Sequence, residues 1–179
     1  MLQKDNRMKV LELFFIDPMP ESGGYQLREM SRMIPLAPVS LKNYLSELEK
    51  EDLIKKTLHR VQQYPLYSAN RDSSYFKTLK KLHSIRAIEE SGLLDVIDSS
   101  CMPNTIVLFG SVARGEDIKE SDIDLFVEAD QEHLVLKRFE KILQRRINLL
   151  FSTSFRGLSN ELKNNIINGI VLKGYLKGY

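Results

Sequence analysis

The chain has 179 residues, of which 28% are charged and 42% hydrophobic, and its formal net charge is +2. This composition is ordinary for a globular protein, and the length accommodates one large domain or two small ones. A net charge this small does not by itself indicate nucleic-acid binding. No apolar run approaches the roughly 20 residues that a membrane-spanning helix needs, so we expect no membrane partner.

Two features bear on the cellular location. Cys101 is the only cysteine, which excludes an intramolecular disulfide and a site built from several thiolates. The first residues, 1–9, are polar and lack the apolar stretch of a signal peptide. We therefore expect a cytoplasmic protein whose single thiol is inert.

The N-terminal part of the chain contains three amphipathic helical patterns followed by two short strand patterns. In each helical pattern, apolar residues recur at offsets of three and four, which is typical of a helix with one buried face. The expected helices span 4–15, 25–34 and 40–50, and the expected strands span 53–57 and 65–69. Three helices followed by a hairpin is the order of a winged helix-turn-helix domain.

This region resembles archaeal and bacterial winged-helix regulators, chiefly in the runs 27–31 and 45–54. In such folds the third helix enters the major groove, and the hairpin contacts the backbone or the minor groove. The resemblance implies a double-stranded DNA partner and, as is common for these regulators, a possible homodimer. The implied base contacts come from Lys42, Asn43 and Ser46. The implied phosphate contacts come from Lys55, Lys56, His59 and Arg60.

A protein-interaction module is the alternative interpretation of the same region. Winged helices also serve in that role, and acidic residues dilute the positive charge along this stretch. These residues are Glu47, Glu49, Glu51 and Asp52.

A connecting segment follows. The apolar stripe from position 75 to 90 predicts a helix of about four turns, and a further helical segment is expected over 93–97. Lys77, Lys80 and Lys81 are expected to form its solvated face.

The most informative stretch runs from position 105 to 128. A continuous apolar run predicts a buried strand over 105–109, and a second strand is expected over 123–128. Between them, Gly110 and Ser111 allow a turn into a short helix, whose free N–H groups can bind a phosphate together with the serine hydroxyl. Arg114 can pair with phosphate oxygens.

Two carboxylates stand at the entrance of the second strand. Side chains alternate along a strand, so Asp122 and Asp124 project from the same face. Adjacent carboxylates repel each other, which indicates a cation between them. A phosphate-binding turn beside paired carboxylates points to a nucleoside triphosphate with bound Mg²⁺, because magnesium binds a few carboxylates together with phosphate oxygens.

The spacing of these motifs resembles the signature of the DNA polymerase beta superfamily of nucleotidyltransferases. Ten residues separate Gly110-Ser111 from Asp122-Ile123-Asp124, and the wording is similar to the minimal nucleotidyltransferase branch of that superfamily. The resemblance covers about residues 100–175. It implies that Gly110 and Ser111 hold the triphosphate of ATP or another nucleoside triphosphate. It also implies that Asp122 and Asp124 are catalytic metal ligands for up to two Mg²⁺ ions.

The same resemblance bears on partners. The minimal branch includes small prokaryotic proteins that act as antitoxins or accompany helical partner proteins. An acceptor hydroxyl on a protein, or a helical partner protein, is therefore expected.

Later elements complete the predicted sheet. Helices are expected over 131–143 and 155–167, and strands over 145–151 and 170–172, the last at an edge. Where many relatives carry a third carboxylate on the later strand, this chain has Asn148. An amide cannot accept a proton from a nucleophile and supplies no negative charge for a second cation.

The sequence therefore predicts an α+β fold with three parts. These are a winged helix-turn-helix domain at 1–70, connecting helices at 71–100 and a nucleotidyltransferase-like mixed sheet with flanking helices at 101–179. Two functions remain open. One is a Mg²⁺-dependent nucleotidyltransferase joined to a DNA-binding domain. The other is a transcriptional regulator whose weak or inactive nucleotidyltransferase-like domain senses a nucleotide.

Overall fold

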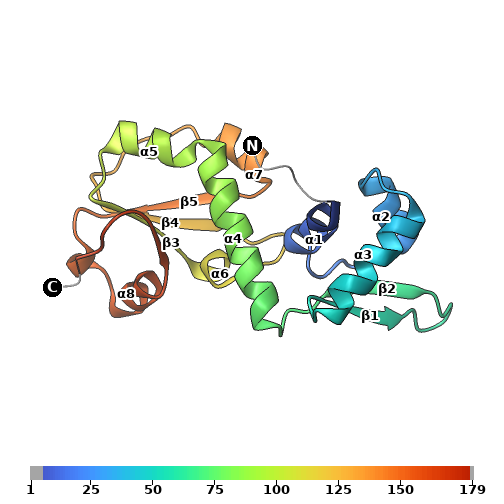
Figure 1. Ribbon diagram of the computed structural model, residues 1–179. Coiled ribbons are helices and arrows are strands. Elements are labelled where there is room, and N and C mark those ends of the chain that lie inside the picture. Colours follow the sequence, from blue (N-terminus) through green and yellow to red (C-terminus); the bar gives the residue numbers. More distant parts are fainter. Residues whose placement is uncertain (1–5, 178–179) are drawn as a thin grey trace. The chain divides into compact units, whose positions relative to one another are not determined.

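The computed structural model describes residues 6–177, and Figure 1 shows its helices and strands. The chain divides into two compact units, Met1–Lys77 and Thr78–Tyr179, and the division falls inside helix α4 (Ser74–Ser91). The first unit has a two-stranded sheet and the second a four-stranded one. Within residues 6–177, no helix combines the length and the apolar content that a membrane crossing requires.

The N-terminal unit has the order of elements that the sequence predicts: three helices and then an antiparallel hairpin. They are α1 (Asn6–Ile16), α2 (Leu27–Met33), α3 (Pro38–Lys50), β1 (Ile54–Leu58) and β2 (Pro65–Ala69). Positions 4 and 5 of the expected first helix lie outside the described residues. Helix α3 begins two residues earlier than predicted, because the fixed φ of Pro38 suits a first helical turn.

The core of this unit lies between α1, α3 and the hairpin. Leu41, Leu45 and Leu48 form the fully buried stripe of α3. The rings of Phe14 and Tyr25 meet edge to face with centroids 5.6 Å apart. An isolated bridge between Tyr25 and Tyr67 adds a short third segment beside the hairpin. The three helices and the hairpin therefore share one apolar interior.

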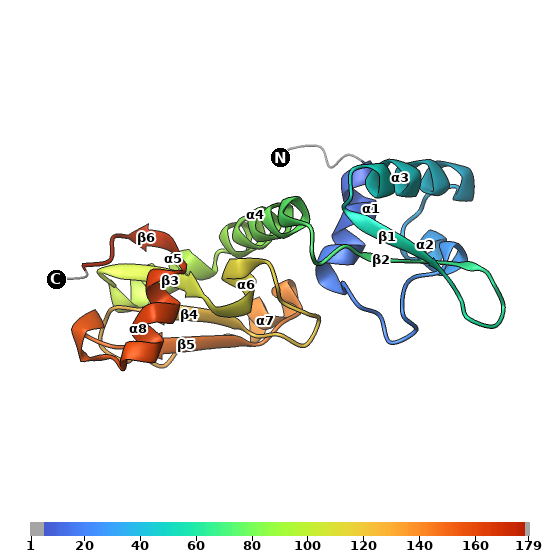
Figure 2. The same cartoon turned by 90° about the horizontal axis from the view of Figure 1, so that it is seen from below.

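The C-terminal unit is a mixed sheet with helices around it, seen from two directions in Figures 1 and 2. Its strands lie in the order β5-β4-β3-β6; β3 is antiparallel to β4 and β6, and β4 is parallel to β5. The strands are β3 (Thr105–Phe109), β4 (Ile123–Val127), β5 (Ile147–Phe151) and β6 (Ile170–Gly174). The remaining helical segments are α5 (Leu93–Cys101), α6 (Gly110–Arg114), α7 (Lys137–Leu143), η1 (Phe155–Gly157) and α8 (Asn160–Ile167).

Alternation along the strands gives this sheet two apolar faces. Ile106 and Leu125 pack with side chains from α4, α5 and α7. Val107 and Phe126 face the other way and pack with Phe155 of η1 and with α8. Figure 1 shows α5 and α8 on opposite sides of the strands. By the same alternation, position 124 projects on the face that α8 covers.

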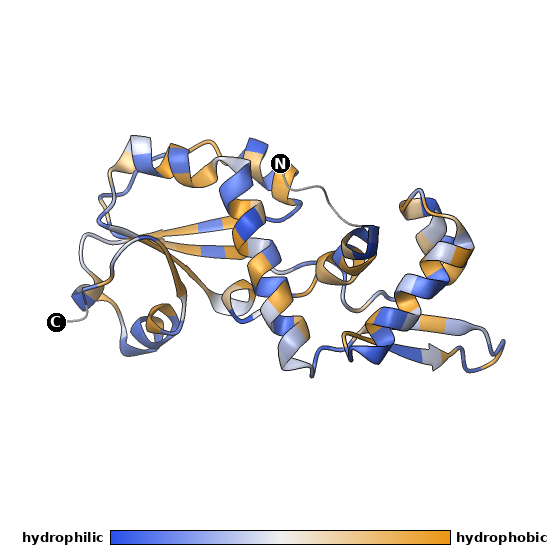
Figure 3. Ribbon diagram, in the orientation of Figure 1, coloured by the Kyte–Doolittle hydropathy of each residue, from blue (hydrophilic) through white to orange (hydrophobic). Residues whose placement is uncertain are grey.

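The distribution of hydropathy agrees with a sheet covered on both faces. Figure 3 shows apolar residues along the strands of this unit and mixed hydropathy on the helices around them. Every residue of β3 except Phe109 is buried. The continuous apolar run 105–109 is therefore a strand packed on both faces, as the sequence indicates.

Two predicted helices are shorter than expected. The segment before α7 is a loop in which Leu134 and Leu136 pack against the core while Val135 is exposed, so the apolar pattern there has a period of two rather than 3.6. The predicted helix 155–167 is divided, because the Ser159 side chain accepts a hydrogen bond from the N–H of Leu162 and starts α8 anew.

The predicted solvated face of α4 is wrong at one position. Lys80 is only 1% exposed, although it was grouped with Lys77 and Lys81. Lys80 follows the buried Phe76 by four residues and precedes the buried Ile88 by eight, and both offsets return to the same side of a helix. The side chain therefore lies on the buried stripe.

Candidate active site

The turn after β3 is shaped by Gly110. Its φ of +76° is strained for residues with a Cβ, and a Cβ built there would lie 2.6 Å from Oδ2 of Asp124. The close approach arises because Phe109 pairs with Asp124 in the antiparallel register of β3 and β4. Glycine at this position thus lets the turn that is predicted to bind phosphate lie directly against the Asp124 carboxylate.

The two carboxylates and Asn148 form one cluster. Asp124 and Asn148 are partners in the parallel register of β4 and β5. The side-chain amide of Asn148 donates one hydrogen bond to Oδ2 of Asp122, at 3.1 Å, and another to Oδ1 of Asp124, at 3.0 Å. Asn148 therefore bridges the two carboxylates.

The paired carboxylates of this cluster are bridged by a neutral amide rather than by a cation of the protein. Asp122 and Asp124 are half-buried, and Asn148 is exposed. Among residues 6–177, no salt bridge reaches either carboxylate, so the amide N–H groups of Asn148 are what separates their charges. An amide dipole relieves the repulsion between the two carboxylates only in part.

The phosphate-binding candidates lie next to this cluster in the fold. Ser111 is half-buried in the first turn of α6, and its carbonyl accepts the N–H of Glu116. Arg114 is exposed and forms an ion pair with Glu116, with Nε and Oε2 3.0 Å apart. Exposed pairs of this kind contribute little free energy, so Arg114 can exchange Glu116 for a phosphate.

The other acids of this region have different positions. Asp117 is buried and bound to Lys80 and Arg145. Glu128 lies at the far end of β4, where its Oε1 accepts the N–H of Phe155. Glu120 is exposed. Within the described residues, no group of three His, Cys, Asp or Glu side chains is arranged to hold a metal.

The candidate DNA-contacting residues lie on the surface of the N-terminal unit. Lys42, Asn43 and Ser46 are exposed on α3, opposite its buried leucines. On the hairpin, Lys56 and Arg60 are exposed, whereas Lys55 donates to Oδ2 of Asp72 at 2.7 Å.

The hairpin tip has its own order. The His59 ring stacks on the Tyr64 ring at a centroid distance of 4.7 Å, and His59 Nδ1 accepts the N–H groups of Val61 and Gln62. The turn is therefore closed by a side chain.

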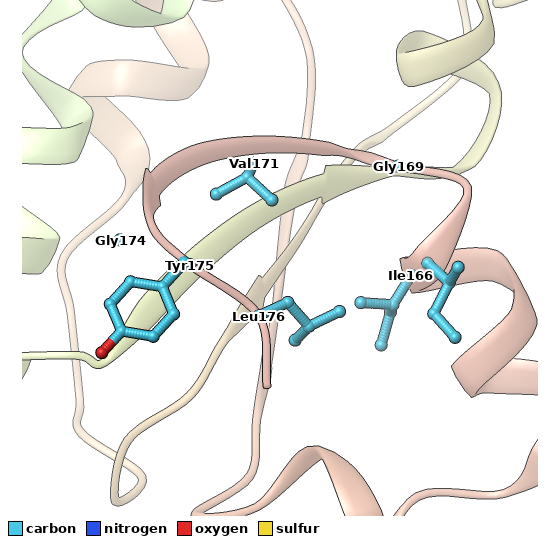
Figure 4. A pocket seen from close by; sticks show the side chains of 7 residues that line it. Ile166, Gly169, Val171, Gly174, Tyr175 and Leu176 are labelled. Carbon is cyan, nitrogen blue, oxygen red and sulfur yellow. The ribbon is translucent and has the colours of Figure 1, made fainter. Parts of the chain in front are cut away.

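Two pockets lie in the C-terminal unit, away from these residues. One, of about 460 Å³, is lined mainly by apolar side chains of α8, β6 and the residues that follow, as Figure 4 shows. The other, of about 380 Å³, is more polar and contains Cys101, Glu128 and Glu132. Burial, with a smaller effect of the Glu132 charge, raises the pKa of the Cys101 thiol, which makes it less reactive.

Comparison with known proteins agrees with this geometry. Residues 98–171 match the family described as "Nucleotidyltransferase domain". Over 58 residues the chain is 45% identical to a protein of Methanocaldococcus jannaschii named "Putative protein adenylyltransferase". That match covers 28% of this chain and 58% of the relative, so the chain spans somewhat more than half the length of the relative.

The C-terminal half of the chain therefore contains a nucleotidyltransferase domain of the polymerase beta type. The matched residues include the Gly110 turn, both carboxylates and Asn148. The N-terminal helices and hairpin lie outside the match.

The donor set of this domain fits a magnesium ion. Two half-buried carboxylates offer hard oxygen ligands. Asp124 Oδ2 lies so close to the Gly110 backbone that a Cβ at position 110 would be only 2.6 Å from it. Asn148 can present its carbonyl oxygen to a cation once the amide turns away from the carboxylates. The set carries two negative charges rather than three.

Proposed function

We propose that this protein is a Mg²⁺-dependent nucleotidyltransferase that moves a nucleoside monophosphate from ATP, or another nucleoside triphosphate, to an acceptor hydroxyl. The observation that supports it most is the approach of the Gly110 turn to Asp124, within residues that match the nucleotidyltransferase family. A phosphate-binding backbone and a cation-binding carboxylate then serve one ligand.

The roles of the residues follow from their chemistry. Gly110 and Ser111 hold the triphosphate through backbone N–H groups and a hydroxyl, and Arg114 pairs with phosphate oxygens. Asp122 and Asp124 hold Mg²⁺, with a possible second ion. When bound, Mg²⁺ neutralises the charge that develops on the phosphate oxygens.

The proton of the acceptor must leave by a route other than the cluster amide. The acceptor oxygen forms a bond to the α-phosphorus while the bond to the pyrophosphate breaks. Asn148 cannot take the proton, so the proton passes to solvent or to a phosphate oxygen. Positioning and charge neutralisation then supply most of the rate enhancement, and the reaction is slow for this class.

The name of the relative suggests the acceptor class. That protein is named for protein adenylylation, and we extend the idea to this chain: ATP is the donor and a hydroxyl of a partner protein the acceptor.

Transfer of label tests this proposal. The full chain is incubated with α-labelled ATP, Mg²⁺ and candidate partner proteins, beside the Asp122→Ala/Asp124→Ala variant. We expect labelled partner with the wild type only. Equal labelling by the two proteins, or none by either across nucleotides and partners, would contradict the proposal.

We further propose that the N-terminal unit is a winged helix that binds double-stranded DNA. Exposed Lys42, Asn43 and Ser46 on α3, with buried leucines on its other side, support this assignment. Lys55, Lys56 and Arg60 of the hairpin would contact phosphates, once Lys55 exchanges Asp72 for one. A homodimer stays a prediction.

Binding of labelled duplex DNA at low salt tests the winged helix. We expect Lys56→Glu to weaken binding and to lower its salt dependence, because one phosphate contact is lost. Lys163→Glu, an equal change in the C-terminal unit, is the control. Absence of binding at low salt, or equal losses for both variants, would leave protein interaction as the role of this unit.

The second candidate function is a nucleotide sensor without turnover, and Asn148 favours it. Here Mg²⁺–ATP binds and shifts the affinity for DNA, but no label is transferred. Asn148→Asp separates the two candidates: a large gain of transfer indicates a site weakened by the amide, whereas unchanged transfer indicates that the amide does not limit activity.

A further inference from the structure

A buried ion-pair cluster of one carboxylate and two cations anchors the loop that joins α6 to β4. Asp117 is 1% exposed, and its Oδ2 lies 3.1 Å from Nζ of Lys80 and 2.7 Å from a guanidinium nitrogen of Arg145. Lys80 comes from α4 and Arg145 from the segment before β5, so three elements far apart in sequence meet at one carboxyl group.

The two cations also hold the backbone of the loop. Lys80 Nζ donates to the Asp117 carbonyl at 2.5 Å. Arg145 donates to the carbonyls of Ile118, at 2.5 Å, and Ser121, at 3.0 Å. Ser121 Oγ accepts the N–H of Ile118 at 2.9 Å. Ser121 directly precedes Asp122. The hydrogen bond from Arg145 to the Ser121 carbonyl therefore fixes the peptide bond that leads into Asp122.

The cluster is poorly explained by stability alone. Replacing buried ion pairs with apolar side chains of similar volume is often neutral or stabilising. Asp117 Oδ1 is buried and has no hydrogen-bond partner among the described residues, which adds a desolvation cost. The cluster's evident structural consequence is instead the geometry that it imposes on the loop.

We propose that Lys80, Asp117 and Arg145 are positioning residues that set the loop and Asp122 for binding the magnesium nucleotide. The inference rests on the proposed function and deepens it. Lys80 lies outside the matched residues 98–171, so the family match assigns it no role. Asp117 itself is not a metal ligand in this arrangement, because its one bonded oxygen already faces two cations.

The variant Lys80→Met tests the proposal with little risk to folding. It removes one of two cations and leaves Asp117 paired with Arg145, so no buried charge is left alone. Lys81→Met is the matched control, the same change one residue further along α4. Both full-length variants are compared with the wild type in thermal unfolding, in amide hydrogen exchange over 116–124 and in calorimetric titration with Mg²⁺–ATP.

We expect Lys80→Met to unfold within a few degrees of the wild type. Exchange over 116–124 should be at least about tenfold faster in this variant, since the loop has lost one of its two anchors. Its affinity for Mg²⁺–ATP should fall about 10- to 100-fold, the range seen when residues that support metal ligands are replaced. Lys81→Met should match the wild type in all three measurements.

The outcomes separate this inference from the proposed function. Wild-type exchange rates over 116–124 in Lys80→Met overturn the positioning role, whatever the wild type binds. Faster exchange with unchanged Mg²⁺–ATP affinity also overturns it. A wild type that binds no Mg²⁺–ATP contradicts the proposed function instead, and the exchange measurement still decides whether Lys80 fixes the loop.

Arg145→Lys supplies an independent second variant. An ammonium group can keep the pair with Asp117, but it lacks the planar fork that also reaches the carbonyls of Ile118 and Ser121. We expect faster exchange at 118–122 and weaker Mg²⁺–ATP binding, with the ion pair retained. Unchanged exchange and affinity would contradict the role assigned to Arg145.

Discussion

The buried carboxylate Asp117 and the carboxylate pair Asp122 and Asp124 are close in sequence but are neutralised in different ways. Asp117 is buried and faces two permanent cations, Lys80 and Arg145. Asp122 and Asp124 are half-buried and share only the amide of Asn148. A carboxylate paired with cations of the protein is neutralised for as long as the protein stays folded. A pair that shares one neutral amide stays available for a cation that comes and goes.

The largest effect is expected from removing a charge of the Asp122–Asp124 pair. Asp124→Asn keeps the shape of the side chain but removes a hard anionic ligand. We expect Mg²⁺-dependent ATP affinity, measured by calorimetry, to fall about 100-fold, or about 2.7 kcal/mol. The unfolding temperature without Mg²⁺ should not fall, because the repulsion between neighbouring carboxylates is relieved.

Asp95→Ala is the control for that change, since Asp95 is exposed on α5 of the same unit. Equal affinity losses in the two variants would show that general charge, not the cluster, attracts the metal.

The next largest effect concerns the close contact between the Gly110 backbone and the Asp124 carboxylate. Gly110→Ala forces a left-handed conformation on alanine, at a cost of about 1–2 kcal/mol, and drives a methyl group against Asp124. We expect a lower unfolding temperature, by about 2–4 °C per kcal/mol, together with weaker Mg²⁺–ATP binding. Gly157→Ala has nothing within 4 Å of its Cβ and should change neither. Equal shifts in both glycine variants would contradict the packing argument.

Converting the Asn148 amide to an acid should make the cluster of Asp122, Asp124 and residue 148 more dependent on a bound cation. In Asn148→Asp, three carboxylates adjoin, so we expect a lower unfolding temperature without Mg²⁺ and a larger rise when Mg²⁺ is added. The affinity for Mg²⁺ should increase about tenfold, because ligand charge strengthens divalent-cation binding. If the unfolding temperature of Asn148→Asp were the same with and without Mg²⁺, the cluster would not hold the ion.

The smallest effect is expected for a carboxylate paired at the surface. The hydrogen bond from Lys55, and then its charge, lowers the pKa of Asp72 below 3.8. Since the folded pKa lies below the unfolded value, the stabilisation is present above about pH 3.8 and is lost as the pH falls through the folded pKa.

Unfolding temperatures of the wild type and Asp72→Asn between pH 2 and 6 measure this contribution. Asp72 is fully exposed, so the difference should be slight and should vanish at the acid end. A large difference that persists at pH 2 would mean that the pair does more than neutralise charge.

Much of the fold could be predicted because the decisive patterns are local. The alternation along β4 places Asp122 and Asp124 on one face, and the apolar run of β3 predicts a buried strand. The first part of the predicted helix 131–143, before position 137, is wrong because Leu134 and Leu136 pack against the core from an extended loop. Here tertiary packing outweighs helical propensity.

The sequence alone determined which residues are available for chemistry: a glycine-serine turn, two acids of one face and an asparagine in place of a third. Spacing within a single strand or turn decides such features. Only the tertiary structure decided that Asn148 bridges both acids, because that contact depends on the register between strands 24 residues apart in sequence.

It was also the tertiary structure that buried Lys80 against Asp117, 37 residues away. Helical spacing can place Lys80 on the buried stripe of α4, but it cannot name the carboxylate that compensates its charge. That partner depends on where a distant loop passes, and packing across the whole unit fixes that path.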